Sequence, residues 1–270
     1  MPADGPISHD ASHNSRLDLP PGYTVVALRE RGDAFVHAKE IAATEGAGTL
    51  VWVRRFDTVE FALVLEPEQI LSDARRVLYG VMNAAADAVA AFCPPERPLE
   101  FSWPDTIMLD GGILGGTRLA WPPGCAEDAV PDWLVASVML RSVVAVKRDL
   151  AQMLEPPPSG LSHQLDQLQR RGTSLEAEGF EIMEAEPIIN SFCRHFLVYL
   201  DRWNEKGFVP VGQTYLARLP EQKGVKRGID VNGDLLARTL ADPKNPKRES
   251  YVQALAAPQW LDPETGEPWL

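Results

Sequence analysis

The sequence predicts an α+β fold, in which helices cover one face of a mixed or antiparallel sheet and a small β-rich domain follows. Three observations carry this prediction: β-branched runs joined by short turns, long apolar stretches with helical spacing, and a change of character after Pro220. The chain has 270 residues and 45% of them are hydrophobic, which suits one domain of catalytic size with an appendage. We divide it into a flexible tail (1–16), a main domain (17–219) and a small β-rich C-terminal domain (220–270).

The first third of the chain alternates strands and helices. Residues 23–28 read as a short strand, and Asp33 is a plausible N-cap for a helix that ends near Thr44. The runs 49–53 and 59–65 are rich in β-branched residues and predict an antiparallel pair across a short basic loop. The Ala-rich stretch 71–92 predicts a single buried helix that ends before two prolines.

The stretch from Ser102 to Gly116 predicts a hairpin with a binding site. Trp103-Pro104-Asp105 should end one strand, and Asp-Gly-Gly makes a tight turn into a strand that runs to Leu119. Gly115-Gly116 lies inside that returning strand. Glycine weakens a strand and is tolerated where a ligand or another backbone comes close.

The second half of the main domain reads as one more strand followed by helices. Residues 133–140 are an almost unbroken apolar run, typical of a central strand covered on both faces. Thr173-Ser174 is a helix-start signal, and helices are expected over 187–204 and 211–218. Residues 228–236 read as strand, Asn-Gly turn and strand.

The chain ends in a stretch, 258–270, that contains Pro and Trp. Trp260 and Trp269 are poor candidates for a solvated tail, so we expect this stretch to pack on the rest of the protein.

Charge and cysteine content exclude several classes of function. A net charge of −12 argues against a broad nucleic-acid or anionic-membrane surface, because both need clustered Lys and Arg. Three cysteines, far apart and without metal-type spacing, fit structural roles in a reducing compartment, so a cytoplasmic protein without a resident metal is expected. No apolar run reaches the length of a membrane span.

The hairpin resembles the Lys-Trp-Pro-Asn-Asp … Lys-x-Gly-Gly segment of biotin and lipoate protein ligases, with Trp103-Pro104-Asp105 and Gly115-Gly116 in place. The order of elements over about 200 residues, up to Asp201-Arg202-Trp203, is similar to the catalytic domain of biotin protein ligases. Residues 228–236 resemble the small cap that follows it. The resemblance implies a class II synthetase-like fold with an SH3-like C-terminal domain.

The family's chemistry is implied by the same resemblance. Those ligases join biotin or lipoate to ATP as an acyl-adenylate, with Mg²⁺, and pass the acyl group to a lysine of a carrier domain. The implied partners are therefore a small acyl substrate and a biotinyl or lipoyl carrier domain. We expect neither a nucleic acid nor a membrane as a partner, and we expect the protein to be a monomer or a homodimer. The implied ligand-binding residues are Trp103, Pro104, Asp105, Thr106, Gly115 and Gly116.

The chain departs from the family where positive charge is needed. Ile113 stands at the position of the ligase lysine, and the Gly-Arg-rich loop has shrunk to Arg54-Arg55-Phe56-Asp57-Thr58. Loss of one such charge forfeits roughly 10²-fold in rate. Arg54, Arg55 and Arg118 are the candidate replacements, and strand alternation puts Arg118 on the same face as Gly116 if no bulge intervenes. We expect slow or absent adenylation, and any residual activity should depend on these arginines.

Other departures point the same way. The family's Asn-Asp after Trp-Pro becomes Asp105-Thr106, and the Asn of a Gly-x-Gly-x-Asn strand becomes Leu140. Simpler interpretations stay open for the site residues: Trp103 and Pro104 could anchor a turn, Asp105 could accept backbone hydrogen bonds there, and Arg54-Arg55 could be solvated.

Three functions therefore remain. The first is an active ligase for biotin, lipoate or a related acyl group. The second is a non-catalytic protein that binds the acyl ligand or the carrier. The third is an ATP-independent acyl transferase, which would need a Lys or Cys near the pocket.

Overall fold

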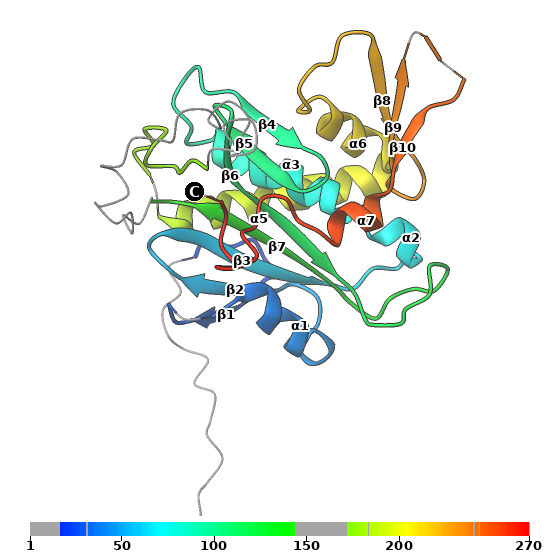
Figure 1. Cartoon of the computed structure of the whole chain (residues 1–270). Coiled ribbons are helices and arrows are strands. Elements are labelled where there is room, and N and C mark those ends of the chain that lie inside the picture. The colour runs from blue at the N-terminus through cyan, green and yellow to red at the C-terminus, as the bar shows by residue number, and fades with distance from the viewer. Residues whose placement is uncertain are drawn as a thin grey trace, which may run out of the picture.

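A seven-stranded sheet forms the centre of the main domain. The computed structural model describes residues 17–30, 32–143, 172–182, 184–239, 241–242 and 244–269. The strand order is β1-β2-β3-β7-β6-β5-β4 (Figure 1). Only β1 and β2 are parallel; the other neighbouring pairs are antiparallel. The strands span Thr24–Leu28 (β1), Thr49–Arg54 (β2), Thr58–Leu65 (β3), Leu99–Ser102 (β4), Thr106–Leu109 (β5), Gly112–Ala120 (β6) and Leu134–Arg141 (β7).

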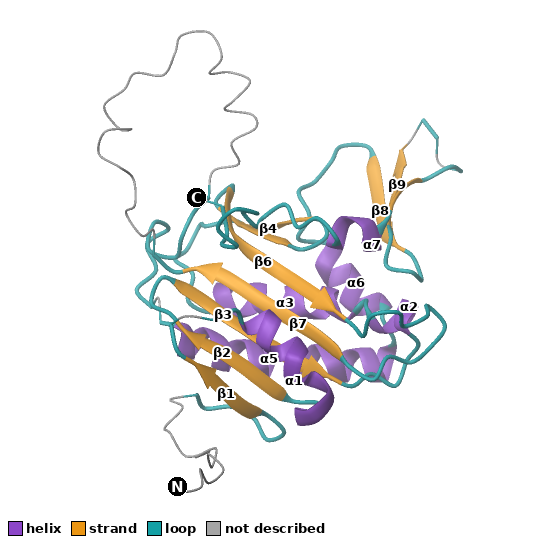
Figure 2. Cartoon of the chain, turned by 60° about the horizontal axis from the view of Figure 1, so that its bottom comes forward, coloured by secondary structure: helices purple, strands orange, loops and turns teal. Residues whose placement is uncertain are grey.

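Helices cover both faces of this sheet, so the expectation of helices over one face is wrong. Figure 2 shows α3 (Val77–Ala90) and α5 (Ala185–Lys206) behind the sheet and α1 (Ala34–Glu45) in front of it. The buried residues of α1 are all alanines and pack on small side chains of β2, β3 and β7. We call the two surfaces of the sheet the α1 face and the α3/α5 face.

The alternation of side chains assigns each strand residue to one face. In β3, Phe61 and Leu63 belong to the large core under α3 and α5, whereas Ala62 packs under α1. All eight residues of β7 are buried, and β7 lies between β3 and β6. The prediction of a central strand covered on both faces is therefore confirmed.

Two local predictions need correction. The stretch read as one helix is two, α2 (Leu71–Ala74) and α3, because hydrogen bonds to the third preceding residue replace the α-helical pattern at Arg76, Leu78 and Tyr79. Thr173-Ser174 starts only a single turn, in which the Ser174 hydroxyl accepts the Ala177 N–H at 3.1 Å.

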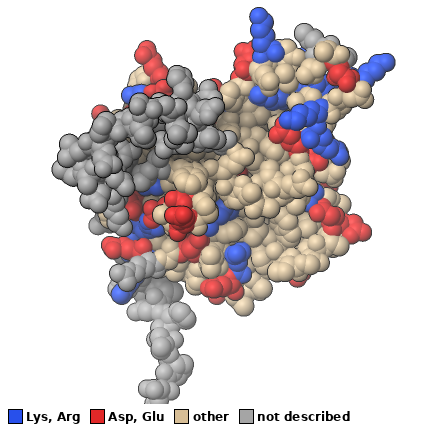
Figure 3. Space-filling view, viewed as in Figure 1, with Lys and Arg blue, Asp and Glu red and all other residues tan. Residues whose placement is uncertain are grey.

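The small β-rich C-terminal part is a separate three-stranded sheet, as expected. It consists of β8 (Val225–Ile229), β9 (Leu235–Thr239) and β10 (Lys247–Glu249), and the predicted Asn232-Gly233 turn joins β8 to β9. The helices α6 (Val209–Leu216) and α7 (Tyr251–Leu255) flank it. Figure 3 shows Lys and Arg side chains gathered over this sheet. The domain boundary at residue 220 stays a prediction.

An aromatic cluster fastens this part to α3. The Tyr79 hydroxyl donates to the Gly233 carbonyl at 2.5 Å, and the Tyr79 and Tyr251 rings are stacked with centroids 4.9 Å apart. Beyond α7 the chain turns back and crosses the α1 face in front of β6 and β7, as the red segment of Figure 1 shows. We call residues 257–269 the C-terminal segment.

Candidate functional site

The turn between β4 and β5 is held by aromatic residues of α3 and α6. The Trp103 indole N–H donates to the Tyr79 hydroxyl at 3.0 Å, and the Pro104 carbonyl accepts from the Tyr215 hydroxyl at 2.9 Å. The Trp103 side chain packs against the core of the α3/α5 face. Trp103 and Pro104 thus position the hairpin, and the Trp103 ring faces away from the α1 face.

Asp105 is a buried carboxyl group at the start of β5, with 1% of its surface exposed. Its Oδ1 accepts from the Thr106 hydroxyl at 3.1 Å, and its carbonyl accepts the Thr117 N–H at 2.9 Å, but its Oδ2 has no hydrogen-bond partner. Burial raises the pKa of Asp105 to about 7, although the hydrogen bond from Thr106 and the nearby Trp260 N–H both act to lower it. This carboxyl can therefore be neutral near pH 7.

The two glycines of β6 have different reasons to be glycine. A side chain on Gly115, which has φ +157°, would overlap the backbone of Met139 in β7, so Gly115 serves sheet packing at a bulge. A side chain on Gly116 would overlap the Asp105 carbonyl and would lie 2.5 Å from two atoms of the Trp260 ring. Gly116 therefore forms a cradle on the α1 face, and an aromatic ring fills it.

That ring comes from the C-terminal segment. Trp260 is fully buried and forms a small apolar cluster with Ile113 of β6 and Met139 of β7, against which Met108 and Leu261 pack. Ile113, to which the resemblance assigns the position of the ligase lysine, is likewise 0% exposed. Truncating a buried Trp costs about 3–5 kcal/mol, so this contact holds the segment firmly.

The candidate cations separate between the two faces. Arg118 lies on the α1 face as predicted, since Gly116 pairs with Met139 and Arg118 with Ser137 in one register. Arg55 also lies on this face, because its guanidinium nitrogen Nη1 is 3.8 Å from Oε2 of Glu60. Arg54 instead lies over the Trp52 ring, at 5.1 Å, and Trp52 belongs to the core of the α3/α5 face. Arg55 and Arg118 are thus brought together with Gly116, and Arg54 is not.

Arg118 and Arg55, the two candidate cations on the α1 face, are both engaged by carboxylates. Arg118 donates to both oxygens of Asp33 at 3.0 Å. Burial alone would raise the pKa of Asp33, but the hydrogen bonds and charge of Arg118 outweigh burial and lower it. Arg55 donates to Asp57 at 3.1 Å and to Glu267 of the C-terminal segment.

Sequence reasoning missed two residues of this site. Glu60 is buried, accepts the Ala34 N–H at 2.7 Å, and has a pKa raised mainly by burial. Arg141 of β7 is buried and donates to the Pro268 carbonyl. The available signal was the spacing of two in strands that are mostly apolar. Glu60 lies two residues before Ala62 and Arg141 two residues after Met139, so each pair shares a face of the sheet.

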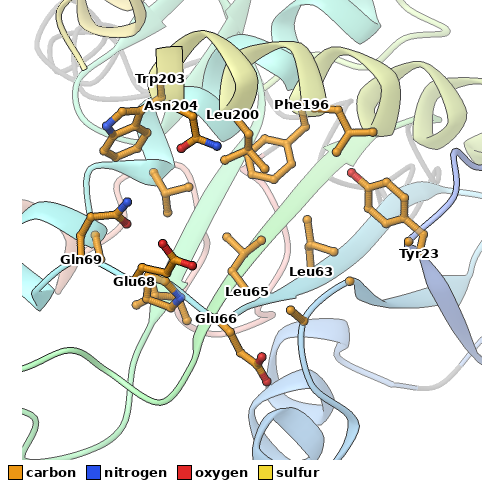
Figure 4. Close-up of a pocket in the computed structure, with 18 of the residues that line it drawn as sticks. Tyr23, Leu63, Leu65, Glu66, Glu68, Gln69, Phe196, Leu200, Trp203 and Asn204 are labelled. Atoms are coloured by element: carbon orange, nitrogen blue, oxygen red, sulfur yellow. The ribbon is translucent and has the colours of Figure 1, made fainter. Parts of the chain in front are cut away.

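A separate cavity of about 460 Å³ opens on the α3/α5 face. Figure 4 shows Phe196, Leu200 and Trp203 of α5 on one side of it and Leu63 and Leu65 of β3 on the other. None of the residues that the sequence singled out for the site lines this cavity. The described residues contain no group of His, Cys, Asp and Glu placed to hold a metal ion. Every helix in the described part of the chain is too short or too polar to span a bilayer.

Comparison with known proteins gives one family. The model of the biotin/lipoate A/B protein ligase family matches residues 19–217. A biotin–[acetyl-CoA-carboxylase] ligase of Paracoccus denitrificans is 24% identical over 245 residues, which is 85% of this chain and 91% of that protein.

Solved structures show the same fold. A biotin protein ligase-like protein of unknown function from Silicibacter has a TM-score of 0.69 at 23% identity, over 88% of this chain and 98% of the other. The biotin protein ligase of Aquifex aeolicus in complex with biotin and ATP has a TM-score of 0.58 at 14% identity, over 83% and 94%.

Proposed function

Because the chain belongs to the biotin/lipoate A/B protein ligase family, we propose that it is a slow biotin–protein ligase. It binds biotin on the α1 face, activates it with ATP as an acyl-adenylate, and transfers it to a lysine of a carrier domain. The observation that supports this most is the cradle at Gly116, which lies on one face with Arg118 and Arg55. Biotin is preferred over lipoate because the named relatives are biotin ligases.

The apolar half of the site suits the fused rings of biotin. Ile113, Met108 and Met139 pack around the Trp260 ring above Gly116, and the ligand would take the place of that ring. Methionine side chains adapt to irregular ligands. The unpartnered Oδ2 of Asp105, at the edge of this space, can pair with a ureido group of the ligand.

The cationic half suits the phosphate. In the activation step a carboxylate oxygen of biotin forms a bond to the α-phosphorus of ATP, and pyrophosphate leaves. Arg55 and Arg118 would offset the negative charge that develops there. ATP would bring Mg²⁺ with its phosphates, and the ion would offset part of their negative charge. In the second step the carrier lysine attacks the acyl carbon, AMP leaves, and the lysine proton passes to solvent.

The rate should be low for two reasons. Ile113 cannot supply the charge of the missing lysine. The guanidinium groups of Arg55 and Arg118 must also exchange Asp57 and Asp33 for phosphate. These engaged arginines favour a second candidate function, a protein that binds the biotin ligand or its carrier without turnover.

The third function, an ATP-independent acyl transferase, has less support. Cys193 is part of the core of the α3/α5 face, and Cys93 and Cys125 pack against that core. None of the three is therefore placed beside Gly116 as a nucleophile. Unpaired cysteines and the use of ATP fit the cytoplasm, where we expect the protein to work.

The deciding experiment is ATP–pyrophosphate exchange with biotin, lipoate and octanoate, paired with calorimetric titration of biotin. A slow exchange that requires biotin and falls at least tenfold in Arg118→Ala supports the ligase. Biotin binding without exchange supports the second function. Absence of both contradicts the assignment of biotin to this site.

A further inference from the structure

The C-terminal segment occupies both halves of the proposed ligand site. At its inner end, the Trp260 ring lies against Gly116 and packs on Ile113 and Met139. At its outer end, Glu267 pairs with Arg55, and the Pro268 carbonyl accepts from Arg141. One short segment thus places a ring in the apolar half and a carboxylate on a cation of the other half.

The segment is preformed rather than loosely draped. A bridge pairs Leu261 with Pro268, and the Trp269 N–H donates to the Trp260 carbonyl at 3.0 Å. The Asp262 N–H also donates to the Glu267 carbonyl at 2.8 Å. These hydrogen bonds form a narrow hairpin, so Trp260 and Glu267 keep a fixed separation.

The inner contact is apolar but leaves polar groups without partners. Trp260 Nε1 and Asp105 Oδ2 are both buried, and the indole N–H is near enough to the carboxyl to lower its pKa, but neither atom has a hydrogen-bond partner. Unsatisfied buried groups weaken an otherwise favourable contact. A ligand that satisfies Asp105 therefore has an advantage with which to displace the ring.

The residue at the ligase lysine position fits this occupant. Ile113 is fully buried beneath Trp260. A lysine there would bury an ammonium group among the apolar side chains of Met139, Trp260 and Met108. An apolar isoleucine at this position therefore suits a site that is closed by the Trp260 ring.

We propose that residues 257–269 are an internal occupant that closes the ligand cleft, and that a biotin-type ligand and this segment exclude one another. The inference rests on the proposed function for the identity of the ligand. The closure itself rests only on the contacts of Trp260, Glu267 and Pro268. The ligand class it favours has an apolar ring system at one end and an anionic group at the other.

Closure is tested by the accessibility of the position under the ring. In the full-length chain, Ile113→Cys places a thiol beneath Trp260, and its reaction with a maleimide is followed by peptide mass spectrometry. We expect the thiol to react at least tenfold faster when Trp260→Ala is added. Trp269→Ala is the matched control, because Trp269 is 37% exposed and lies outside the apolar cluster of Trp260. The variant loses the indole hydrogen bond to the Gln259 carbonyl but keeps the backbone hydrogen bond to Trp260, so it should change the rate less than twofold.

Two further measurements keep the test decisive. Cys193 is fully buried in the other core, so its slow labelling reports that each variant is folded. Glu267→Gln removes the charge pair and keeps the ring, and it should raise the rate two- to fivefold at low salt. Equal labelling in the presence and absence of Trp260, in folded protein, overturns the closure.

The ligand is tested separately by adding biotin to the Trp260→Ala protein. Slower labelling supports mutual exclusion. If labelling stays fast in the presence of biotin, both the proposed function and the exclusion of biotin by the segment are contradicted. The closure itself is judged separately, by the increase in labelling rate that Trp260→Ala causes.

Discussion

Trp260 lies where a side chain on Gly116 would lie, although 144 positions of sequence separate them: the Cδ1 and Nε1 atoms of the indole are 2.5 Å from the place of the missing Cβ. The glycine at the centre of the proposed ligand site is thus the contact point of the protein's own C-terminal segment. This relationship changes what substitutions at the site are expected to do.

Substitution of Gly116 should lower the stability of the protein more than substitution of a glycine in an open strand. The sequence alone predicts that Gly116→Val abolishes ligand binding at a modest cost in stability. The overlap of a Cβ with the Asp105 carbonyl and with Trp260 now predicts a loss of about 1–3 kcal/mol even for Gly116→Ala. Chemical denaturation measures it. Gly228→Ala, with no atom within 4 Å of the added Cβ, is the matched control and should change stability by less than about 1 kcal/mol.

Asp105 should make the protein less stable as the pH rises. Its pKa is raised to about 7 in the folded protein from 3.8, mainly by burial. Between about pH 4 and 7 the unfolded chain binds fewer protons than the folded one, so the free energy of unfolding falls with rising pH across that window.

Each unit by which the pKa is raised changes the free energy of unfolding by about 1.4 kcal/mol, so the loss across this pH window should amount to a few kcal/mol. In Asp105→Asn this part of the pH dependence should disappear from denaturation curves taken from pH 4 to 8. Asp128→Asn, at an exposed position, should retain it. An unchanged slope in Asp105→Asn would mean that the carboxyl is charged in the folded state.

Arg118 and Arg54 should differ in their effect on exchange. Arg118 lies on the face of Gly116, so Arg118→Ala should lower biotin-dependent exchange at least tenfold. Arg54 lies over Trp52 on the other face, so Arg54→Ala should lower it less than twofold. Robust exchange that survives alanine at Arg54, Arg55 and Arg118 together would refute the electrostatic account.

Restoring the lysine should rescue little on its own. Ile113→Lys buries an ammonium beneath Trp260 and should cost roughly 3–6 kcal/mol, whereas Ile113→Met should cost less than about 1.5 kcal/mol. Exchange should rise above either single variant only in Ile113→Lys with Trp260→Ala. Full rescue by Ile113→Lys alone, measured by exchange and melting temperature, would argue against a closed site.

Local patterns were enough for most of the fold. The Asp33 cap, the antiparallel β2 and β3, the buried β7 and the Asn232-Gly233 turn are all encoded by neighbouring residues, and each was found where expected. The position of Arg118 also followed from alternation along β6. Such features depend on period and turn chemistry alone.

What could not be predicted depends on distant contacts. Nothing near Arg118 indicates that Asp33, 85 positions away, takes both of its donors. The need of Trp260 for a partner was evident from its chemistry, but the choice of Gly116 was not, because a buried ring can pack on any complementary surface. Arg54 and Arg55 both read as loop residues in the sequence, whereas Arg54 ends β2 and lies on the α3/α5 face and Arg55 lies on the α1 face.

The most direct test of a biotin site closed by the C-terminal segment is calorimetric titration of biotin into the full-length protein and into Trp260→Ala. A ligand that needs a minor open state binds with an apparent affinity reduced by the fraction of that state. We therefore predict a Kd at least tenfold lower for Trp260→Ala than for the wild type, with Trp269→Ala unchanged. Equal affinities, or no binding to folded Trp260→Ala, would contradict the account.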